Sequence, residues 1–466
     1  MPLKILLTHA YFLDEDKKEK EIMRPYPPLG ILYISAFLEK NGFDNSIHDS
    51  TFSTFEKLCQ EILATRPDLI GIYTNLMTKL NVLRLITFIK SKPELEKCKI
   101  VLGGPEVRNH QDNFLRAGAD ILVLGEGEES MLEIAQALAS KQSNLAAIKS
   151  IAFKAEDGKI IQTPARSLLK NIDELSFPNR KKINLQLYFD AWKSKHGQSA
   201  LSISTMRGCP YTCKWCSRAV YGQSYRRRSA KLVVDEMEYI IKNYQVDTLW
   251  FVDDVFTVSH KWMSEFRDEI VKRKVNIPFE CITRADRLNE ETFQMLKDSG
   301  CFRVWIGAES GSQKIIDAMD RRVSVHQVRE MIQLAKRFDI KSGTFIMLGY
   351  PGETEEDIEE TIHHLKVADP DLYTITVAYP IKGTPLYSEV ENVFVEQLDW
   401  ESSTDRDIDF KRTYRRKYYD YALRRLYNEV AYHKGKLNQL SSAKLAVHKV
   451  KSIAAKGGML WNRILS

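Results

Sequence analysis

The feature of this sequence that most restricts its fold is a repeated alternation of short apolar runs with segments of helical periodicity. In residues 1 to about 150 the alternation predicts a parallel α/β sheet, because strands separated by helices pair in parallel. Helices are expected near residues 30–40, 52–65, 79–91 and 129–139. The expected strands are Lys4–Thr8, Ser46–His48, Leu69–Tyr73, Ile100–Leu102 and Ile121–Leu124.

A second alternation begins near residue 200 and contains six strand-helix repeats within about 180 residues. This number of repeats predicts a partial β/α barrel or a continuous sheet, with the active site at the carboxyl ends of the strands. Helices are expected near residues 230–243, 259–273, 290–298, 312–319, 325–337 and 355–367. The expected strands are Ala200–Thr205, Thr248–Val252, Phe279–Thr283, Arg303–Ala308, Lys341–Met347 and Leu372–Ala378.

Four regions follow from these patterns. Residues 1–145 form the first sheet domain, 146–195 a connector with a short β excursion, 196–395 the partial barrel, and 396–466 a helical C-terminal region. In the last region we expect helices at 410–433 and 441–456. The first is crowded with Tyr and Arg, so it is interpreted as a cap over the barrel mouth, with an ordinary surface helix as the alternative.

Composition excludes several classes of protein. With 466 residues, of which 44% are hydrophobic, the chain can bury a large core and is not disordered. Lys and Arg number 68 and Asp and Glu 62, and the resulting charge of +6 is too small for binding dominated by nucleic-acid phosphates. The first apolar run is too short for a signal peptide, and no run is long enough to span a membrane. We therefore expect a cytoplasmic protein, soluble or peripheral to a membrane.

Turn-forming residues follow several strands of the first domain. They occur in Pro27-Pro28-Leu29-Gly30, Thr74-Asn75, Gly103-Gly104-Pro105 and Gly125-Glu126-Gly127-Glu128. In an open parallel sheet, ligands bind at the carboxyl ends of the strands, so these loops predict a rim that holds a nucleotide or a corrin.

Three of the seven cysteines lie in one short loop after the first strand of the second alternation, at Cys209, Cys213 and Cys216. Three thiolates at this spacing can bind three irons of a 4Fe-4S cube and leave the fourth iron open to a chelating ligand. The alternative is a zinc knuckle, which needs a fourth ligand that the neighbouring sequence does not offer. The other cysteines, Cys59, Cys98, Cys281 and Cys301, are isolated and are interpreted as small buried hydrophobes.

The cysteine spacing, the aromatic Trp215 before the last cysteine and the position after the first repeat strand resemble the radical S-adenosylmethionine superfamily. The resemblance implies that the open iron binds S-adenosylmethionine and that the reduced cluster cleaves it to a 5′-deoxyadenosyl radical. It also implies a set of residues at the strand ends that contact S-adenosylmethionine. These are Trp215, Asp253, Asp254, Arg284, Glu309, Ser310, Gly349 and Gly352. Ordinary turns and helix caps are the alternative for each of them.

The first domain, with its Pro-Pro-Leu-Gly, Gly-Gly-Pro and Gly-Glu-Gly-Glu loops, resembles the Rossmann-like cobalamin-binding domain of one branch of that superfamily. The likeness is to the anaerobic magnesium-protoporphyrin IX monomethyl ester cyclase type and to related hopanoid-modifying enzymes. The implied cobalamin contacts are Thr8, His9, Leu29, Gly30, Thr74, Asn75, Gly103, Gly104, Pro105, Gly125, Glu126 and Gly127. The Asp-x-His-x-x-Gly loop that supplies a cobalt ligand is missing after the first strand, so we expect cobalt without a protein histidine. A domain that has lost cobalamin is the alternative.

The resemblance implies an enzyme that uses a 4Fe-4S cluster, S-adenosylmethionine and cobalamin to modify an unactivated carbon, most simply by methylation. Radical cyclisation without methyl transfer is the first alternative, and a redox or cobalamin sensor without catalysis is the second. The expected partners are a small or lipid-like substrate and an electron donor such as flavodoxin or ferredoxin, with no nucleic acid.

The C-terminal tail carries the whole basic excess of the chain. After Glu429 there is no acidic residue, and seven cations follow, namely Lys434, Lys436, Lys444, Lys449, Lys451, Lys456 and Arg463. Apolar residues interleave with them at Leu445, Val447, Val450, Ile453, Met459, Leu460, Trp461, Ile464 and Leu465. A basic amphipathic helix of this kind predicts peripheral binding to an anionic membrane. The alternative is a helix that docks its apolar side on the core.

Overall fold

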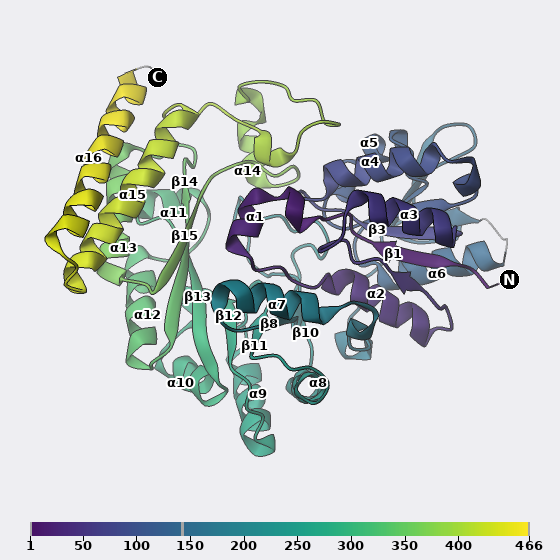
Figure 1. Ribbon diagram of the computed structural model, residues 1–466, viewed down its shortest axis with the longest axis horizontal. Coiled ribbons are helices and arrows are strands. Elements are labelled where there is room, and N and C mark those ends of the chain that lie inside the picture. The colour runs from purple at the N-terminus through teal and green to yellow at the C-terminus, as the bar shows by residue number, and fades with distance from the viewer. Residues whose placement is uncertain (1, 141–143, 465–466) are drawn as a thin grey trace. The chain divides into compact units, whose positions relative to one another are not determined.

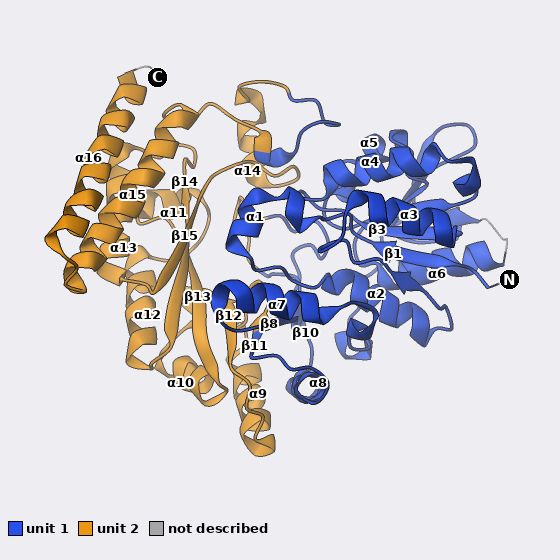
Figure 2. Cartoon of the chain, in the orientation of Figure 1, with its two compact units in different colours: residues 1–210, 217–249, 398–406 blue, residues 211–216, 250–397, 407–466 orange. Residues whose placement is uncertain are grey.

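The computed structural model describes residues 2–140 and 144–464, which form two compact units (Figure 1, Figure 2). Unit 1 consists of residues 1–210, 217–249 and 398–406, and unit 2 of residues 211–216, 250–397 and 407–466. The α/β fold predicted from the sequence is confirmed, and the strands lie within two residues of their expected ends.

Unit 1 is built on a seven-stranded sheet of order β2-β1-β3-β4-β5-β6-β7, parallel from β2 to β5 and antiparallel at β6 and β7. Its strands are β1 (Ile5–Thr8), β2 (Ser46–Ile47), β3 (Leu69–Tyr73), β4 (Lys99–Gly103), β5 (Ile121–Val123), β6 (Ile151–Lys154) and β7 (Ile160–Gln162). Successive residues of β1 alternate between two apolar cores, with Leu6 in one and Ile5 and Leu7 in the other.

Helices cover both faces of this sheet. One core contains residues of α3 (Phe55–Thr65), α4 (Lys79–Lys90) and α5 (Gln111–Arg116), and the other contains residues of α2 (Leu29–Lys40) and α6 (Glu128–Ala139). The helices α1 (Lys17–Ile22), α7 (Leu185–His196) and α8 (Ala230–Asn243) complete the helices of this unit. The segment 398–406 also belongs to unit 1, where the Trp400 ring packs edge-on against Phe114 of α5 at 4.8 Å between centroids.

The second sheet has six strands in the order β15-β14-β13-β12-β11-β8, as expected for a partial barrel. The strands are β8 (Ala200–Ile203), β11 (Thr248–Phe251), β12 (Phe279–Thr283), β13 (Cys301–Glu309), β14 (Lys341–Leu348) and β15 (Leu372–Val377). The pairs from β12 to β15 are parallel. Between and after the strands of unit 2 lie α9 (His260–Arg273), α10 (Glu290–Asp298), α11 (Gln313–Ala318), α12 (Val325–Arg337), α13 (Glu355–Ala368) and α14 (Pro385–Val390).

Two long helices end unit 2, α15 (Arg416–Leu437) and α16 (Ser442–Ile464). The expected start of the first helix at residue 410 is wrong, because Phe410 forms a β-bridge with Phe394 and Arg415 has extended backbone angles. α15 packs against α13 and α16 (Figure 1). No helix in the described part of the chain is long and apolar enough to cross a membrane.

Candidate active site

The cysteine loop begins after β9 (Met206–Arg207), a strand of two residues that pairs antiparallel with β10 (Arg226–Arg227). Gly208 begins the loop with a φ of +82°, and a Cβ at this position would lie 2.2 Å from the Ser224 hydroxyl. Only glycine therefore permits the turn that leads into Cys209. Cys209 is partly buried, Cys213 is buried and Cys216 is exposed, and none of the three is in a disulfide bond.

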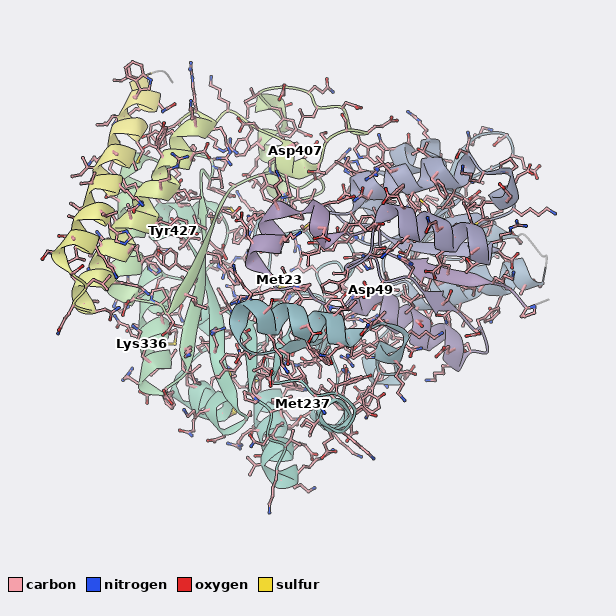
Figure 3. The ribbon with its side chains drawn as sticks, in the orientation of Figure 1. Met23, Asp49, Met237, Lys336, Asp407 and Tyr427 are labelled. Atoms are coloured by element: carbon pink, nitrogen blue, oxygen red, sulfur yellow. The ribbon has the colours of Figure 1, made fainter. Side chains whose placement is uncertain are left out.

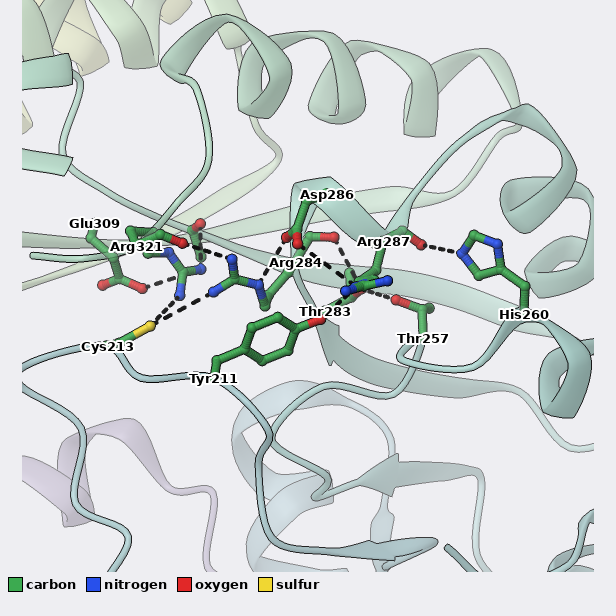
Figure 4. A network of polar contacts seen from close by, with 11 residues as sticks. Tyr211, Cys213, Thr257, His260, Thr283, Arg284, Asp286, Arg287, Glu309 and Arg321 are labelled. Atoms are coloured by element: carbon green, nitrogen blue, oxygen red, sulfur yellow. Dashed lines mark hydrogen bonds and ion pairs between the residues drawn. The ribbon is translucent and has the colours of Figure 1, made fainter. Parts of the chain in front are cut away.

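Two guanidinium groups face the sulfur of Cys213 in unit 2 (Figure 4). Arg284 Nη1 lies 3.7 Å from Cys213 Sγ, and Arg321 Nη1 lies 3.8 Å from it. Both arginines are buried. Buried positive charge beside this sulfur favours the extra electron of a reduced cluster.

Arg284, which follows β12, is held in place on several sides. Its Nε donates to Asp286 at 2.8 Å, and its Nη2 donates to the Arg321 carbonyl at 2.7 Å. The guanidinium also stacks 3.9 Å from the centre of the Tyr211 ring, whose hydroxyl accepts a hydrogen bond from Arg287. The predicted S-adenosylmethionine ligand Arg284 therefore also braces the cysteine loop.

Arg321 joins the cysteine loop to the end of β13. Its Nη2 donates to the Gly307 carbonyl at 2.7 Å and lies 3.7 Å from the Glu309 carboxylate. Sequence reasoning missed Arg321, because an arginine in the turn after α11 carries no spacing signal. Its neighbour Arg322 is exposed and pairs with Asp320, so only the fold distinguishes the two.

Glu309 is a buried acid in a strained position. Its φ of +64° is left-handed, and the pairing of β13 with β14 shifts register between Gly307 and Glu309. Burial raises the pKa of Glu309, while Arg321 and Arg284 oppose that rise. A strained, buried carboxyl group at a strand end is a feature of functional sites.

The other predicted S-adenosylmethionine contacts divide into two groups. Asp253 is buried after β11 while Asp254 is exposed, and Trp215 packs with the cluster that contains Met347 and Tyr350. In contrast, the Ser310 hydroxyl interacts with Thr361 at 3.2 Å and accepts the N–H of Ser312. Ser310 therefore serves the packing against α13, and it is not the cap of α11, whose N-cap is Ser312.

The turn after β14 is held from two sides. Gly349 has a φ of +75°, its N–H donates to Glu353, and its carbonyl accepts a hydrogen bond from Arg412 at 3.1 Å. Burial raises the pKa of Glu353 to about 8. Gly352 is also left-handed and has open space where a Cβ would lie. Sequence reasoning placed Glu353 in the loop after this strand without giving it a role, and it missed Arg412, which lies in no recognisable motif.

In unit 1, the predicted cobalamin rim contains several residues whose side chains have protein partners. Thr8 interacts with Ser50 at 3.1 Å, and Asn75 accepts N–H groups at the start of α4. Gly104 has a φ of +105°, and a Cβ there would lie 2.4 Å from the Thr74 carbonyl, so this turn also requires glycine. Gly103 ends β4 and Pro105 follows it, and Gly125 and Gly127 follow β5, as predicted. Leu29 and Gly30 instead lie in the first turn of α2, which follows α1 and not a strand.

Both ring nitrogens of His9 have partners inside the protein. Nε2 lies 3.0 Å from Asp49, and Nδ1 accepts the N–H of Tyr11 at 3.2 Å (Figure 3 labels Asp49). Asp49 also accepts the Tyr188 hydroxyl at 2.8 Å. Burial raises the pKa of Asp49, but the bonds from His9, Tyr188 and the Thr51 N–H outweigh it and hold the pKa below its ordinary value. This network leaves no nitrogen of His9 for cobalt.

Glu126 has a structural partner for each carboxylate oxygen. Oε1 accepts from Arg207 at 2.8 Å, and Oε2 accepts from Arg226 at 2.7 Å and from the Leu169 N–H at 2.9 Å. Burial raises the pKa of Glu126, but these donors outweigh it and lower the pKa. The carboxylate of Glu126 is therefore occupied by contacts within the protein. The loop after β5 can offer a ligand only its backbone groups.

The donor groups of both sites fit their expected cofactors. Three cysteines on one loop, of which Cys213 faces two cations, suit an iron-sulfur cluster. In unit 1 the buried Thr74 hydroxyl at the end of β3 has no hydrogen-bond partner in the described part of the chain, so it can serve a ligand. A cavity of about 250 Å³ lies beside the loop after β5, lined in part by Gly125, Glu128 and Tyr221.

Comparison with known proteins decides the family. The Radical SAM superfamily matches residues 203–365, and the B12 binding domain matches residues 21–135. The chain carries the two domains of a cobalamin-binding radical S-adenosylmethionine enzyme. Its cofactors are the 4Fe-4S cluster, S-adenosylmethionine and cobalamin, so a domain that has lost cobalamin is not supported. The enzyme names of its relatives do not support the sensor alternative.

Relatives of this radical S-adenosylmethionine enzyme have methyltransferase and cyclase names. An uncharacterized methyltransferase of Pyrococcus horikoshii is 28% identical, with 82% of each chain covered. The anaerobic magnesium-protoporphyrin IX monomethyl ester cyclase of Rubrivivax gelatinosus is 26% identical over 82% of this chain and 69% of its own. The hopanoid C-3 methylase of Methylococcus capsulatus is 24% identical over 77% of this chain and 67% of its own.

Solved structures share the fold of this radical S-adenosylmethionine enzyme. The methyltransferase TsrM from Kitasatospora setae has a TM-score of 0.70 at 19% identity, with 84% of this chain and 75% of that chain covered. The cobalamin-dependent enzyme OxsB has a TM-score of 0.76 at 16% identity, with 98% and 72% covered.

Proposed function

We propose that this enzyme methylates an unactivated carbon of a lipid-like small molecule. When bound, the cluster and S-adenosylmethionine supply a carbon-centred radical, and cobalamin supplies the methyl group. The observation that carries the proposal is the buried pair of arginines on Cys213, beside the strained Glu309 at the end of β13. The methyltransferase and methylase names of two relatives support methylation over other outcomes.

The residues of the cysteine loop and of unit 2 are assigned the following roles. Cys209, Cys213 and Cys216 hold the cluster, and Arg321 and Arg284 offset its negative charge. Glu309, with Asp253 from the end of β11, binds the polar groups of S-adenosylmethionine. The turn after β14 is assigned to adenine through the exposed backbone of Gly352, since both backbone groups of Gly349 have protein partners.

In unit 1 the cobalamin site is assigned to backbone and small side chains at the carboxyl ends of β3, β4 and β5. Thr74 supplies a buried hydroxyl, and the glycines after β4 and β5 allow a flat ligand to approach the backbone. Cobalt is expected without a protein imidazole, because both nitrogens of His9 are occupied. Weak axial ligation suits repeated methyl transfer.

The proposal also covers the electron donor, the cellular location and the substrate class. The electron comes from a low-potential carrier such as flavodoxin or ferredoxin. The enzyme works in the cytoplasm and contacts a membrane through its C-terminal helices. A lipid-like substrate fits that contact, and the hopanoid name of one relative supports the same substrate class.

The test is anaerobic reconstitution with iron and sulfide, followed by reduction in the presence of S-adenosylmethionine carrying a deuterated methyl group. We expect formation of 5′-deoxyadenosine, and with cobalamin and a lipid extract we expect a product that gains one labelled methyl. Cys213→Ala should lose cluster and cleavage, while the buried Cys281→Ser should retain both, since Cys281 lies on β12 outside the loop.

Radical cyclisation without methyl transfer remains the second candidate because of the cyclase relative. It predicts the same 5′-deoxyadenosine but a product that loses hydrogen and gains no label. Failure to cleave S-adenosylmethionine at all would contradict both candidates.

A further inference from the structure

The last helix turns its apolar residues outward. Val450, Ile453 and Trp461 are 64%, 61% and 65% exposed. At 3.6 residues per turn they share one face of α16 with three further exposed side chains, and that face contains no charged residue. We call this face the apolar arc, and it consists of Val447, Val450, Ile453, Leu460, Trp461 and Ile464.

The buried side of α16 is mixed, because Ala455 and Met459 are buried together with two polar residues. Ser452 and Asn462 are buried there, and the Ser452 hydroxyl donates to Glu429 at 2.6 Å. His448 interacts with Asn428 of α15 at 3.2 Å. A helix that buries serine and asparagine and exposes valine, isoleucine and tryptophan has its second interface outside the described contacts.

The expectation that α16 docks its apolar side on the core is therefore wrong for the described contacts. Only Met459 of the predicted apolar residues is fully buried, and Leu445 is partly buried. Leu465, which the sequence placed at the end of the apolar series, lies outside the described residues.

Charge selects the partner that covers the apolar arc. Lys444 and Lys451 are exposed along one edge of the arc and form no ion pair in the described part of the chain. Along the other edge, Lys449 pairs with Glu429, and Arg463 pairs with Glu355. Because no acidic residue follows Glu429, a second copy of α16 would bring cations against cations. An anionic surface is instead complementary to the edge that carries Lys444 and Lys451.

We propose that α16 lies flat on a bilayer that contains anionic phospholipid, with the apolar arc inserted and Lys444 and Lys451 at the headgroups. Trp461, near the end of the helix, suits the boundary between headgroups and acyl chains. The proposal deepens the membrane contact of the proposed function and identifies the surface that makes it. It places the active-site unit beside a lipid-like substrate.

The test is co-sedimentation of the full-length protein with phosphatidylcholine vesicles, with and without phosphatidylglycerol. We expect binding to the anionic vesicles, and at least about a tenfold weaker partition for the variant Val450→Ser/Ile453→Ser/Trp461→Ser. Lys444→Gln/Lys451→Gln should lose the preference for anionic lipid and resemble the wild type at about 0.5 M salt, where charges are screened within a few ångströms.

The matched control is Val271→Ser on α9, because Val271 is 57% exposed on the same unit but far from the tail in sequence. It should bind vesicles like the wild type. Reductive cleavage of S-adenosylmethionine in solution should be unchanged in every variant, which separates failure of docking from failure of the proposed reaction. Equal binding of the triple variant and the wild type, or no binding of either, would overturn the proposal. So would a lipid-free oligomer that the triple variant abolishes.

Discussion

At the scale of single residues, Arg321 is the clearest addition that the fold makes to the sequence. Its positive charge lies 3.8 Å from Cys213 Sγ and should stabilise the reduced, more negative cluster. Arg321→Gln should lower the reduction potential of the cluster by on the order of tens of millivolts. A redox titration followed by electron paramagnetic resonance measures it. The neighbouring Arg322→Gln is the control, and an equal shift in both variants would argue for a general charge effect.

Glu353 gives a pH dependence of stability. Its pKa is about 8 in the fold because the carboxyl group is buried, and near 4.5 when exposed. The folded state therefore holds a proton that the unfolded state releases, so the free energy of unfolding should fall as pH rises between these values. Glu353 can contribute a slope of up to about 1.4 kcal/mol in the free energy of unfolding per pH unit.

Glu353→Gln should remove this part of the slope, because glutamine is neutral at every pH. Urea denaturation of the apoprotein at several pH values checks it. Glu356→Gln, an exposed acid in the first turn of the following helix α13, should leave the slope as it is. A wild-type slope that persists in Glu353→Gln would mean that another group binds the proton.

His9 predicts the spectrum of bound cobalamin. With Nε2 on Asp49 and Nδ1 on the Tyr11 N–H, the ring has no free nitrogen for cobalt. In protein labelled with 15N-histidine, the hyperfine pattern of the Co(II) form should match that of unlabelled protein. A change on labelling would show that a protein imidazole binds the metal.

At the scale of elements, the segment before α15 ties together the ends of two strands. Arg412 donates to the carbonyls of Gly349 after β14 and Ala378 after β15, at 3.1 and 2.7 Å. Arg412→Met should lower the free energy of unfolding by about 3 kcal/mol, since it leaves buried carbonyls unpaired. It should also weaken binding of S-adenosylmethionine, because the Gly349 turn loses one of its two supports.

Thermal unfolding and S-adenosylmethionine binding by the reconstituted protein measure these effects. Lys411→Met removes an exposed cation at the preceding position and is the control. Normal affinity in an unstable Arg412→Met would separate the structural role from the binding role.

The same elements show what sequence can and cannot predict. Strands and most helices followed from local periodicity, which depends on nearby residues only. The start of α15 was misplaced because Phe410 and Arg412 are held by partners distant in sequence. Ser310 and Glu126 were expected to bind cofactors because they lie in recognisable loops, and their hydrogen bonds within the protein became evident only in the fold.

At the scale of the whole molecule, each unit has apolar cores of its own. Loss of the cluster should therefore leave the cobalamin site intact. Cys213→Ala, purified without iron, should bind cobalamin with an affinity within about threefold of the wild type, measured by absorbance titration. A much weaker affinity would mean that the cluster loop shapes the corrin site.

The membership of segment 398–406 in unit 1 determines how the gene can be divided. A fragment that stops at Pro210 would lack α8 and would also lack Trp400, so Phe114 would lose its aromatic neighbour and Lys79 would lose the carbonyl that its ammonium group binds at 2.7 Å. No single cut yields a complete copy of either unit. To study unit 1 separately, residues 398–406 must be fused to the rest of unit 1 through a new linker.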